Sequence, residues 1–413
     1  MRNRGSVSNR SGATRRARRG RPPTRSRIAR TRGRIALLVL AAAALLAGVG
    51  WAAFGATAED TAPLQPAAPA PKAAPARKAV PAASTLFHPL TGPHLAPGSD
   101  PSVLPGPVLI ADRANNRLLV VNPQGEIVWE FPRPGDLRPR ESFKVPDDAF
   151  FSPDGTRIVA TQEDDFAISV IDLAKRRIVY RYGTPGVPGS GPNHLWNPDD
   201  AMLLPGGWIL TADIKNCRLL LIKLGQHRPH RIYGDTTQGC YHAPPRRWGS
   251  PNGAFPMRNG HFLVTEINGN WVDELTLAGK VVRSWHPPGF TYPSDSNEVK
   301  PGLYLSVDYS NPGAVETFDR KGRVVWRYKP RPGDPQLNHP SLAEPLPNGD
   351  ILLNDDDNDR VIVIDPHTNK IVWQYGHTGH PGRAPGYLND PDGVDLAPPH
   401  SLLIRQRATI GHP

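Results

Sequence analysis

Pro146-Asp147-Asp148-Ala149-Phe150-Phe151 opens the first full copy of a pattern that recurs along the chain and decides its fold. A proline followed by a small polar residue begins six segments, at Pro146, Pro198, Pro251, Pro293, Pro340 and Pro391. Successive segments start 52, 53, 42, 47 and 51 residues apart. A repeat of about 40–50 residues is typical of the four-stranded blades of a β-propeller.

Each repeat contains the punctuation that a four-stranded sheet needs. A short apolar strand leads into a turn such as Pro153-Asp154-Gly155, where glycine supplies the positive φ of a tight hairpin. Two more apolar strands follow, and the unit closes with an aromatic-bearing strand, as in Ile127-Val128-Trp129 and Ile371-Val372-Trp373. A small sheet cannot hide both of its apolar faces alone, so the sheets must stack until a ring closes. We interpret the closing aromatic as packing between blades.

The two ends of the repeat region complement each other. Residues 108–129 supply a second, third and fourth strand without a proline-headed first strand, whereas residues 391–396 form such a first strand almost alone. Joining them predicts an all-β, six-bladed β-propeller over residues 107–413. Residues 401–404 have no place in this scheme, which leaves a seven-bladed propeller as the alternative.

Charge is concentrated before the propeller. The chain has 413 residues and a formal net charge of +11, but residues 1–34 alone contain 13 arginines and no acidic residue. The remainder is therefore close to neutral, and a nucleic-acid-binding groove on the propeller is not indicated.

Residues 35–56 are uncharged and predict a transmembrane helix, since 22 residues span about 33 Å as a helix and a bilayer core is about 30 Å thick. The arginine-rich residues 1–34 would stay in the cytoplasm, which places the propeller outside the plasma membrane on a single-pass anchor. The alternative is secretion after cleavage near Ala58, because Ala56-Thr57-Ala58 has the form of a signal-peptidase site. The Pro- and Ala-rich residues 57–106 predict an extended linker.

The turns before the third strands carry a family resemblance. Asp112-Arg113-Ala114-Asn115-Asn116-Arg117, Asp213-Ile214-Lys215-Asn216-Cys217-Arg218 and Asp357-Asn358-Asp359-Arg360 resemble NHL-repeat propellers. The Ile-Val-Trp strand ends resemble quinoprotein-like and arylsulfotransferase-like propellers. This resemblance implies a propeller fold, and it implies functions that range from lyases, lactonases and transferases to plain binding platforms.

The residues that follow the six prolines are candidates for a ring around the central channel. They are oxygen-bearing side chains, the type that binds a hard cation such as Ca²⁺: Asp147, Asp199, Asn252, Ser294, Ser341 and Asp392. The alternative interpretation is that they make local side-chain-to-backbone turns where each strand begins.

Long connections between blades bring histidines toward one mouth of the ring. His194, His242 and His339 come from three different connections, and together they could bind a transition metal or act in acid–base chemistry. The only two cysteines, Cys217 and Cys240, are a candidate disulfide on the extracytoplasmic side of the membrane.

The sequence therefore predicts a membrane-anchored propeller that binds a small-molecule or protein ligand at its mouth. The alternative is an extracytoplasmic propeller enzyme, either a metal-assisted lyase or hydrolase or an arylsulfotransferase-like enzyme.

Overall fold

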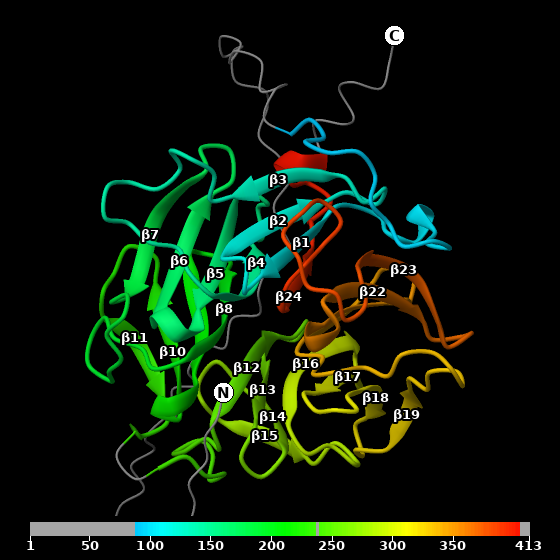
Figure 1. The fold of residues 1–413 in the computed structure, drawn as a ribbon. Helices are drawn as coiled ribbons and strands as arrows, with labels where there is room; N and C mark the ends of the chain where they lie inside the picture. The colour runs from blue at the N-terminus through cyan, green and yellow to red at the C-terminus, as the bar shows by residue number, and fades with distance from the viewer. Residues whose placement is uncertain (1–86, 237–238, 405–413) are drawn as a thin grey trace, which may run out of the picture. The chain divides into compact units, whose positions relative to one another are not determined.

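The computed structural model describes residues 87–236 and 239–404, which form six four-stranded antiparallel sheets (Figure 1). The innermost strand of each sheet contacts the innermost strands of the two neighbouring sheets, so that the six sheets close into a ring. The prediction of an all-β, six-bladed β-propeller is confirmed.

The first three blades, each given from its inner to its outer strand, have the following bounds. Blade 1 consists of β24 (Pro391–Leu396), β1 (Val108–Asp112), β2 (Arg117–Val121) and β3 (Ile127–Phe131). Blade 2 consists of β4 (Pro146–Phe151), β5 (Arg157–Gln162), β6 (Ala167–Asp172) and β7 (Arg177–Gly183). Blade 3 consists of β8 (Pro198–Leu204), β9 (Trp208–Asp213), β10 (Arg218–Lys223) and β11 (Pro229–Tyr233).

The remaining three blades follow in chain order. Blade 4 consists of β12 (Pro251–Pro256), β13 (Phe262–Glu266), β14 (Trp271–Leu275) and β15 (Val281–Trp285). Blade 5 consists of β16 (Pro293–Lys300), β17 (Leu303–Asp308), β18 (Ala314–Asp319) and β19 (Val324–Arg327). Blade 6 consists of β20 (Ala343–Pro345), β21 (Ile351–Asp355), β22 (Arg360–Asp365) and β23 (Lys370–Gly376).

Blade 1 is built from both ends of the described chain, as the sequence predicted. β24 pairs with β1 in an antiparallel ladder that runs from Val108 opposite Leu396 to Asp112 opposite Pro391. Residues 401–404, which left a seventh blade as the alternative, instead pack against blades 1 and 2. Leu403 is buried there, and the Leu402 amide donates to the Gly155 carbonyl at 3.4 Å.

The closing aromatics link neighbouring blades. The side chains of Trp129, Tyr180, Tyr233, Trp285 and Trp373 each donate a hydrogen bond to a carbonyl in the turn between the third and fourth strands of the next blade. For Trp129 the acceptor is Leu173, at 3.1 Å. Trp326 of blade 5 is the exception, since its indole nitrogen has no partner among the described residues.

The third-strand turns are held by buried ion pairs. Arg117 Nε donates to Asp112 Oδ2 at 2.6 Å, and Arg218 Nε makes the same bond to Asp213 at 2.7 Å. In blade 6 the partner of Arg360 is Asp355, at 2.7 Å. Because Asp355 stands five residues before its arginine, as in the other two turns, the shared motif is Asp-x-x-Asn-x-Arg.

Residues 87–106, the described part of the predicted linker, are held against the propeller. Backbone hydrogen bonds join Leu90 to Ile127 and Asp100 to Val372, so this part of the chain lies along the outer strands of blades 1 and 6. Leu95 and Leu104 pack against the apolar core there, which explains why the segment is held despite its proline content. No helix within residues 87–236 and 239–404 has the length and apolarity to cross a membrane, and the predicted span at 35–56 lies outside these residues.

Candidate functional site

A β-bulge at the start of the inner strands shapes the channel. In β4, Pro146 pairs with Gln162 and Ala149 pairs with Ala160. Two residues of β4, Asp147 and Asp148, therefore stand opposite a single residue of β5. The same offset occurs in β8, β12 and β16. A bulge interrupts the alternation of side chains. As a result, Asp147 and Asp148 both face the central cavity.

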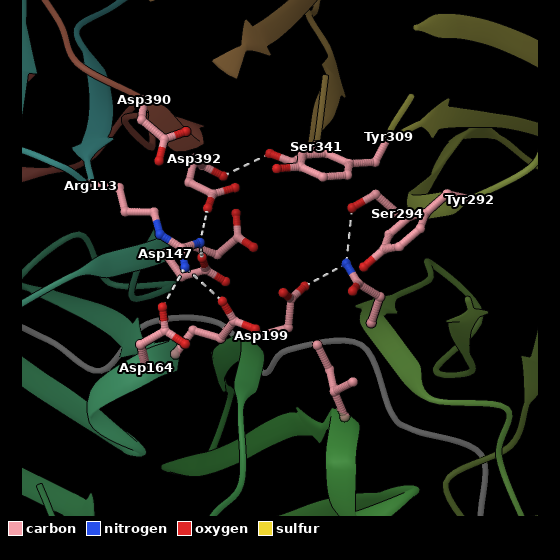
Figure 2. Close-up of a pocket in the computed structure, with 14 residues that line it drawn as sticks. Arg113, Asp147, Asp164, Asp199, Tyr292, Ser294, Tyr309, Ser341, Asp390 and Asp392 are labelled. Atoms are coloured by element: carbon pink, nitrogen blue, oxygen red, sulfur yellow. Dashed lines mark hydrogen bonds and ion pairs between the residues drawn. The ribbon is translucent and has the colours of Figure 1, made fainter. Parts of the chain in front are cut away.

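The bulges surround a cavity of about 420 Å³ at the mouth of the ring (Figure 2). All six residues that follow the prolines line it, namely Asp147, Asp199, Asn252, Ser294, Ser341 and Asp392. The other lining residues are Arg113, Asp148, Glu163, Asp164, Ile214, Tyr292, Tyr309 and Asp390. The ring is therefore a set of cavity-lining side chains and not only a series of local turns.

Arg113 stands at the acidic side of the cavity and contacts four carboxylates. Its Nη1 donates to both Asp147 and Asp392, and its Nη2 donates to Glu163 at 2.8 Å and to Asp164 at 3.1 Å (Figure 2). It is the only cation among the lining residues, which include seven carboxyl groups. Carboxyl groups therefore outnumber cationic groups seven to one in the lining of the cavity.

The same network separates the pKa values of the mouth carboxyls. Burial and the charge of Asp392 raise the pKa of Asp147 well above its ordinary value. Burial opposes ionisation of Asp392 as well, but the Arg113 guanidinium and a hydrogen bond with Asp147 bring its pKa below the ordinary value. Burial, followed by the charge of Asp392, raises the pKa of Asp390 to about 6.

A second acidic layer lies at the floor of the cavity. Asp148, Asp199, Asp200 and Asp295 are buried, and one carboxylate oxygen from each lies within 4.8 Å of the others. At an effective dielectric constant of about 20, two full charges at that distance repel by about 3 kcal/mol. Burial, together with the charge of neighbouring carboxylates, raises the pKa values of Asp148, Asp199 and Asp295 well above their ordinary range. Burial is also the main reason that the pKa of Asp200 rises to about 7.

Apolar side chains close the channel beyond the acidic floor. Phe150, Met202 and Phe255, which stand further along their inner strands, belong to one buried cluster, with the two phenylalanine rings 5.6 Å apart. Near them Glu344 accepts a hydrogen bond from the Leu396 amide, and Asp395 accepts one from the Phe151 amide. The inner strands therefore change from acidic side chains at the cavity to apolar side chains further along.

The structure does not bring the three candidate histidines together. None of them lines the cavity. His194 Nδ1 lies 2.9 Å from its neighbouring Pro192 carbonyl. His339 Nδ1 lies 2.7 Å from Asp357 Oδ2, and its ring stands 4.8 Å from that of Tyr309 in the cavity wall. A catalytic or metal-binding set of these three histidines therefore has no geometric basis.

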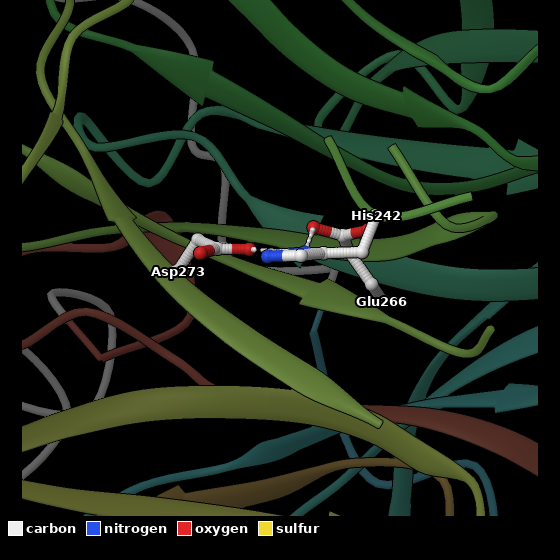
Figure 3. A group of neighbouring side chains, drawn as sticks. All are labelled: His242, Glu266 and Asp273. Carbon is white, nitrogen blue, oxygen red and sulfur yellow. Dashed lines mark hydrogen bonds and ion pairs between the residues drawn. The ribbon is translucent and has the colours of Figure 1, made fainter. Parts of the chain in front are cut away.

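His242 belongs to a separate group with Glu266 and Asp273 (Figure 3). Its Nδ1 lies 2.8 Å from Glu266 Oε1 and 3.6 Å from Asp273 Oδ2, and its ring stacks on Trp271 with centroids 4.0 Å apart. Burial and the contact with Asp273 raise the pKa of Glu266 to about 10. Glu266 also accepts a hydrogen bond from the Gly249 amide, so this group holds the connection between blades 3 and 4 against β13 and β14.

The same connection is tied to blade 3 by a disulfide. Cys217 follows the short helical turn η4 (Ile214–Asn216), and it bonds to Cys240, with the two Cα atoms 5.0 Å apart. His242 is two residues beyond Cys240, so the disulfide and the contact with Glu266 fix neighbouring points of one loop.

Sequence reasoning missed several residues of the site. Arg113 stands inside a turn motif that was interpreted as architecture, and Asp148, Asp200 and Asp295 are the second residues after their prolines. The repeated Pro-Asp-Asp at 146–148 and 198–200 was a usable signal, because two carboxylates in succession are costly on a buried strand unless both serve the channel.

The fold and its acidic mouth define a six-bladed β-propeller with a carboxylate-rich cavity. No protein-family profile matches the chain, and no curated protein matches it by sequence. A protein of unknown function from Bacteroides caccae is structurally similar, with a TM-score of 0.50 and 17% identity over 70% of this chain and 98% of that one.

Two further structures resemble the chain more loosely. The nidogen/laminin complex contains a chain with a TM-score of 0.49 and 15% identity, which covers 71% of this chain and 99% of that one. A catalytically inactive virginiamycin B lyase from Staphylococcus aureus with quinupristin has a TM-score of 0.45 and 16% identity, over 69% of this chain and 86% of that one. At these identities the comparisons establish the propeller fold alone.

Proposed function

We propose that the protein is a binding propeller that takes an organic cation, carrying ammonium or guanidinium groups, into its acidic mouth. The observation that carries this proposal is the composition of the cavity lining, where seven carboxyl groups accompany one arginine. Arg113 supports this choice of ligand, because its guanidinium group is held there by four carboxylates. Such charge-assisted hydrogen bonds are stronger than neutral ones.

Tyrosines complete the wall on the side away from Arg113. Tyr292 and Tyr309 both line the cavity (Figure 2). An aromatic face attracts a cation that approaches to within about 6 Å, so these rings favour the same class of ligand as the carboxylates. The volume of about 420 Å³ admits a small molecule and is too small for a folded partner.

Spermidine and agmatine are suitable probes for this function. Calorimetric titration of the full chain in detergent should show binding of both that weakens as salt rises, and no binding of neutral 1,4-butanediol. The variants Asp390→Asn and Glu163→Gln should lower the affinity about tenfold, since each removes one carboxylate contact. Asp319→Asn, in a surface hairpin of blade 5, is the matched control and should bind as the unaltered chain does. Equal affinity in Asp390→Asn and the unaltered chain would contradict the proposal.

We further propose that residues 35–56 anchor the chain, which presents the propeller outside the plasma membrane. The uncharged segment and the preceding arginines support this orientation. A C-terminal alkaline phosphatase fusion should be active, and the chain should stay in the membrane fraction after a carbonate wash. Recovery of the chain from the medium, with an N-terminus near Ala58, would instead show that the segment is a cleaved signal.

A further inference from the structure

Three buried carboxyl groups at the channel floor have oxygens without the partners that buried polar groups require. Asp148, Asp200 and Asp295 are each at most 2% exposed. Asp148 Oδ1, Asp200 Oδ1 and both carboxylate oxygens of Asp295 have no hydrogen-bond partner among the described residues. Buried polar atoms are nearly always satisfied in folded proteins, so four orphan oxygens in one cluster indicate a missing positive group.

No side chain of the described protein supplies that positive group. Arg113 is engaged by Asp147, Asp392, Glu163 and Asp164 in the layer above. From these observations we infer that the floor binds one Ca²⁺ ion through the carboxylates of Asp148, Asp199, Asp200 and Asp295.

Two of the four carboxylates are held by hydrogen bonds from β12. Asp199 Oδ2 accepts a hydrogen bond from Asn252 Nδ2 at 2.7 Å, and Asp200 Oδ2 accepts one from the Ala254 amide at 3.1 Å. The backbone of Asp148 is fixed on both sides by Thr161, whose hydroxyl accepts from the amide and donates to the carbonyl. Outer contacts of this kind orient the ligands of metal sites.

Glycine keeps the site open. Gly253 occupies the position in β12 that Asp148, Asp200 and Asp295 occupy in their own strands. A β-carbon at Gly253 would lie 2.1 Å from Asp295 Oδ1 and 3.0 Å from Asp200 Oδ2. Any side chain there would therefore collide with two of the ligands.

The ligand chemistry favours Ca²⁺ over other common metals. Ca²⁺ takes about six to eight oxygen ligands at about 2.3–2.6 Å, and four carboxylates offer that number without a fixed geometry. Opposite ligands of such an ion stand about 5 Å apart, comparable to the spacing within the cluster. Mg²⁺ demands a tight octahedron and retains water, and the cluster contains no nitrogen or sulfur ligand to select a transition metal.

This inference goes beyond the proposed function, because the ion sits below the organic cation and needs none of the mouth residues Glu163, Asp164 and Asp390. Asp148 and Asp199 belong to both the cavity lining and the floor, so the ion would enter from the mouth.

The first experiment uses the full chain in detergent, stripped with EGTA and titrated with Ca²⁺ alone. Calorimetry should give one ion per chain, and the melting temperature should rise with Ca²⁺ because the ion binds only the folded state. Mg²⁺ should bind at least tenfold more weakly. An unchanged melting temperature and no heat of binding at 5 mM Ca²⁺ would overturn the inference without any variant.

Variants then place the ion. Asp295→Asn and Gly253→Ala should each weaken Ca²⁺ binding at least tenfold, whereas Asp319→Asn should leave it unchanged. The inference is refuted if the four carboxyl groups merely share protons. In that case Asp295→Asn will raise the melting temperature, and Ca²⁺ will change the melting temperature of neither the variant nor the unaltered chain. Spermidine titrations of the same variants separate the two proposals, since loss of Ca²⁺ with retained spermidine binding isolates the floor from the mouth.

Discussion

The indole nitrogen of Trp373 donates a hydrogen bond to the carbonyl oxygen of Pro123 across 2.9 Å. This bond joins blade 6 to blade 1, the blade that β24 and β1 build together. The tryptophan is fully buried, so the N–H has no water to replace its partner. The contact is one of five of this kind between neighbouring blades, and the junction of blade 5 with blade 6 lacks it among the described residues.

Trp373→Phe should therefore destabilise the propeller by about 1 kcal/mol, the usual worth of a neutral hydrogen bond, plus the lost packing of the indole. Trp326→Phe is the matched control, because the Trp326 indole nitrogen makes no hydrogen bond within the described residues. Urea unfolding followed by circular dichroism measures both. Equal losses in the two variants would show that the bond between blades contributes nothing.

Arg113→Ala should lower the melting temperature, because it leaves Asp147 and Asp392 buried beside each other without a counter-charge. Millimolar agmatine should restore part of the loss by placing a guanidinium group in the same position. Arg383→Ala, which removes an exposed arginine that donates a hydrogen bond to the Asn115 carbonyl, should show neither the loss nor the rescue. Rescue of both variants to the same extent would mean that agmatine stabilises the chain non-specifically.

Glu344 gives the propeller a pH-dependent stability. Burial raises its pKa from 4.5 to about 7, so between these values the folded state holds a proton that the unfolded state has lost. Stability should therefore fall as pH rises from about 4.5 to 7, since the unfolded state binds fewer protons there. Glu344→Gln removes the free-energy cost of ionising a buried carboxyl group above pH 7. It should therefore raise the melting temperature at pH 8 by a few degrees relative to the unaltered chain. At pH 4.5 the two proteins should melt alike, and a constant difference across this range would contradict the assignment.

The Cys217–Cys240 disulfide closes a loop with a sequence separation of 23 residues. By loop entropy such a bond stabilises a protein by about 3 kcal/mol. The chain recovered from cells should resist alkylation when unfolded without reductant and accept two alkyl groups after reduction, as intact mass would show. Two free thiols in freshly isolated chain would place the propeller in a reducing compartment and contradict the proposed orientation.

The repeat predicted the architecture well because each signal in it has a local physical cause. Proline begins an inner strand, glycine turns a hairpin and an aromatic ends a blade, so the six units could be counted from the sequence alone. Closure through β24 was also predictable, since residues 108–129 lacked an inner strand and residues 391–396 lacked the other three.

The site was harder to predict because it depends on geometry that a repeat does not reveal. Strand alternation implies that only one of two adjacent residues faces the channel, and the bulges overturn this for Asp147 and Asp148. The role of Arg113 depends on Asp392, which is 279 residues away in the sequence. The histidines were grouped by their loops, but each loop carries its histidine to partners of its own.

The long sequence separation between Arg113 and Asp392 has a consequence for biosynthesis. Arg113 emerges from the ribosome long before Asp392, and β1 must wait for β24 to cover its open edge. Blades 2 to 6 can form in succession during translation, but the mouth has its full set of charges only after the final strand docks. Under the proposed function, cation binding therefore requires a molecule that has finished folding, and it would serve as a direct assay of intact product.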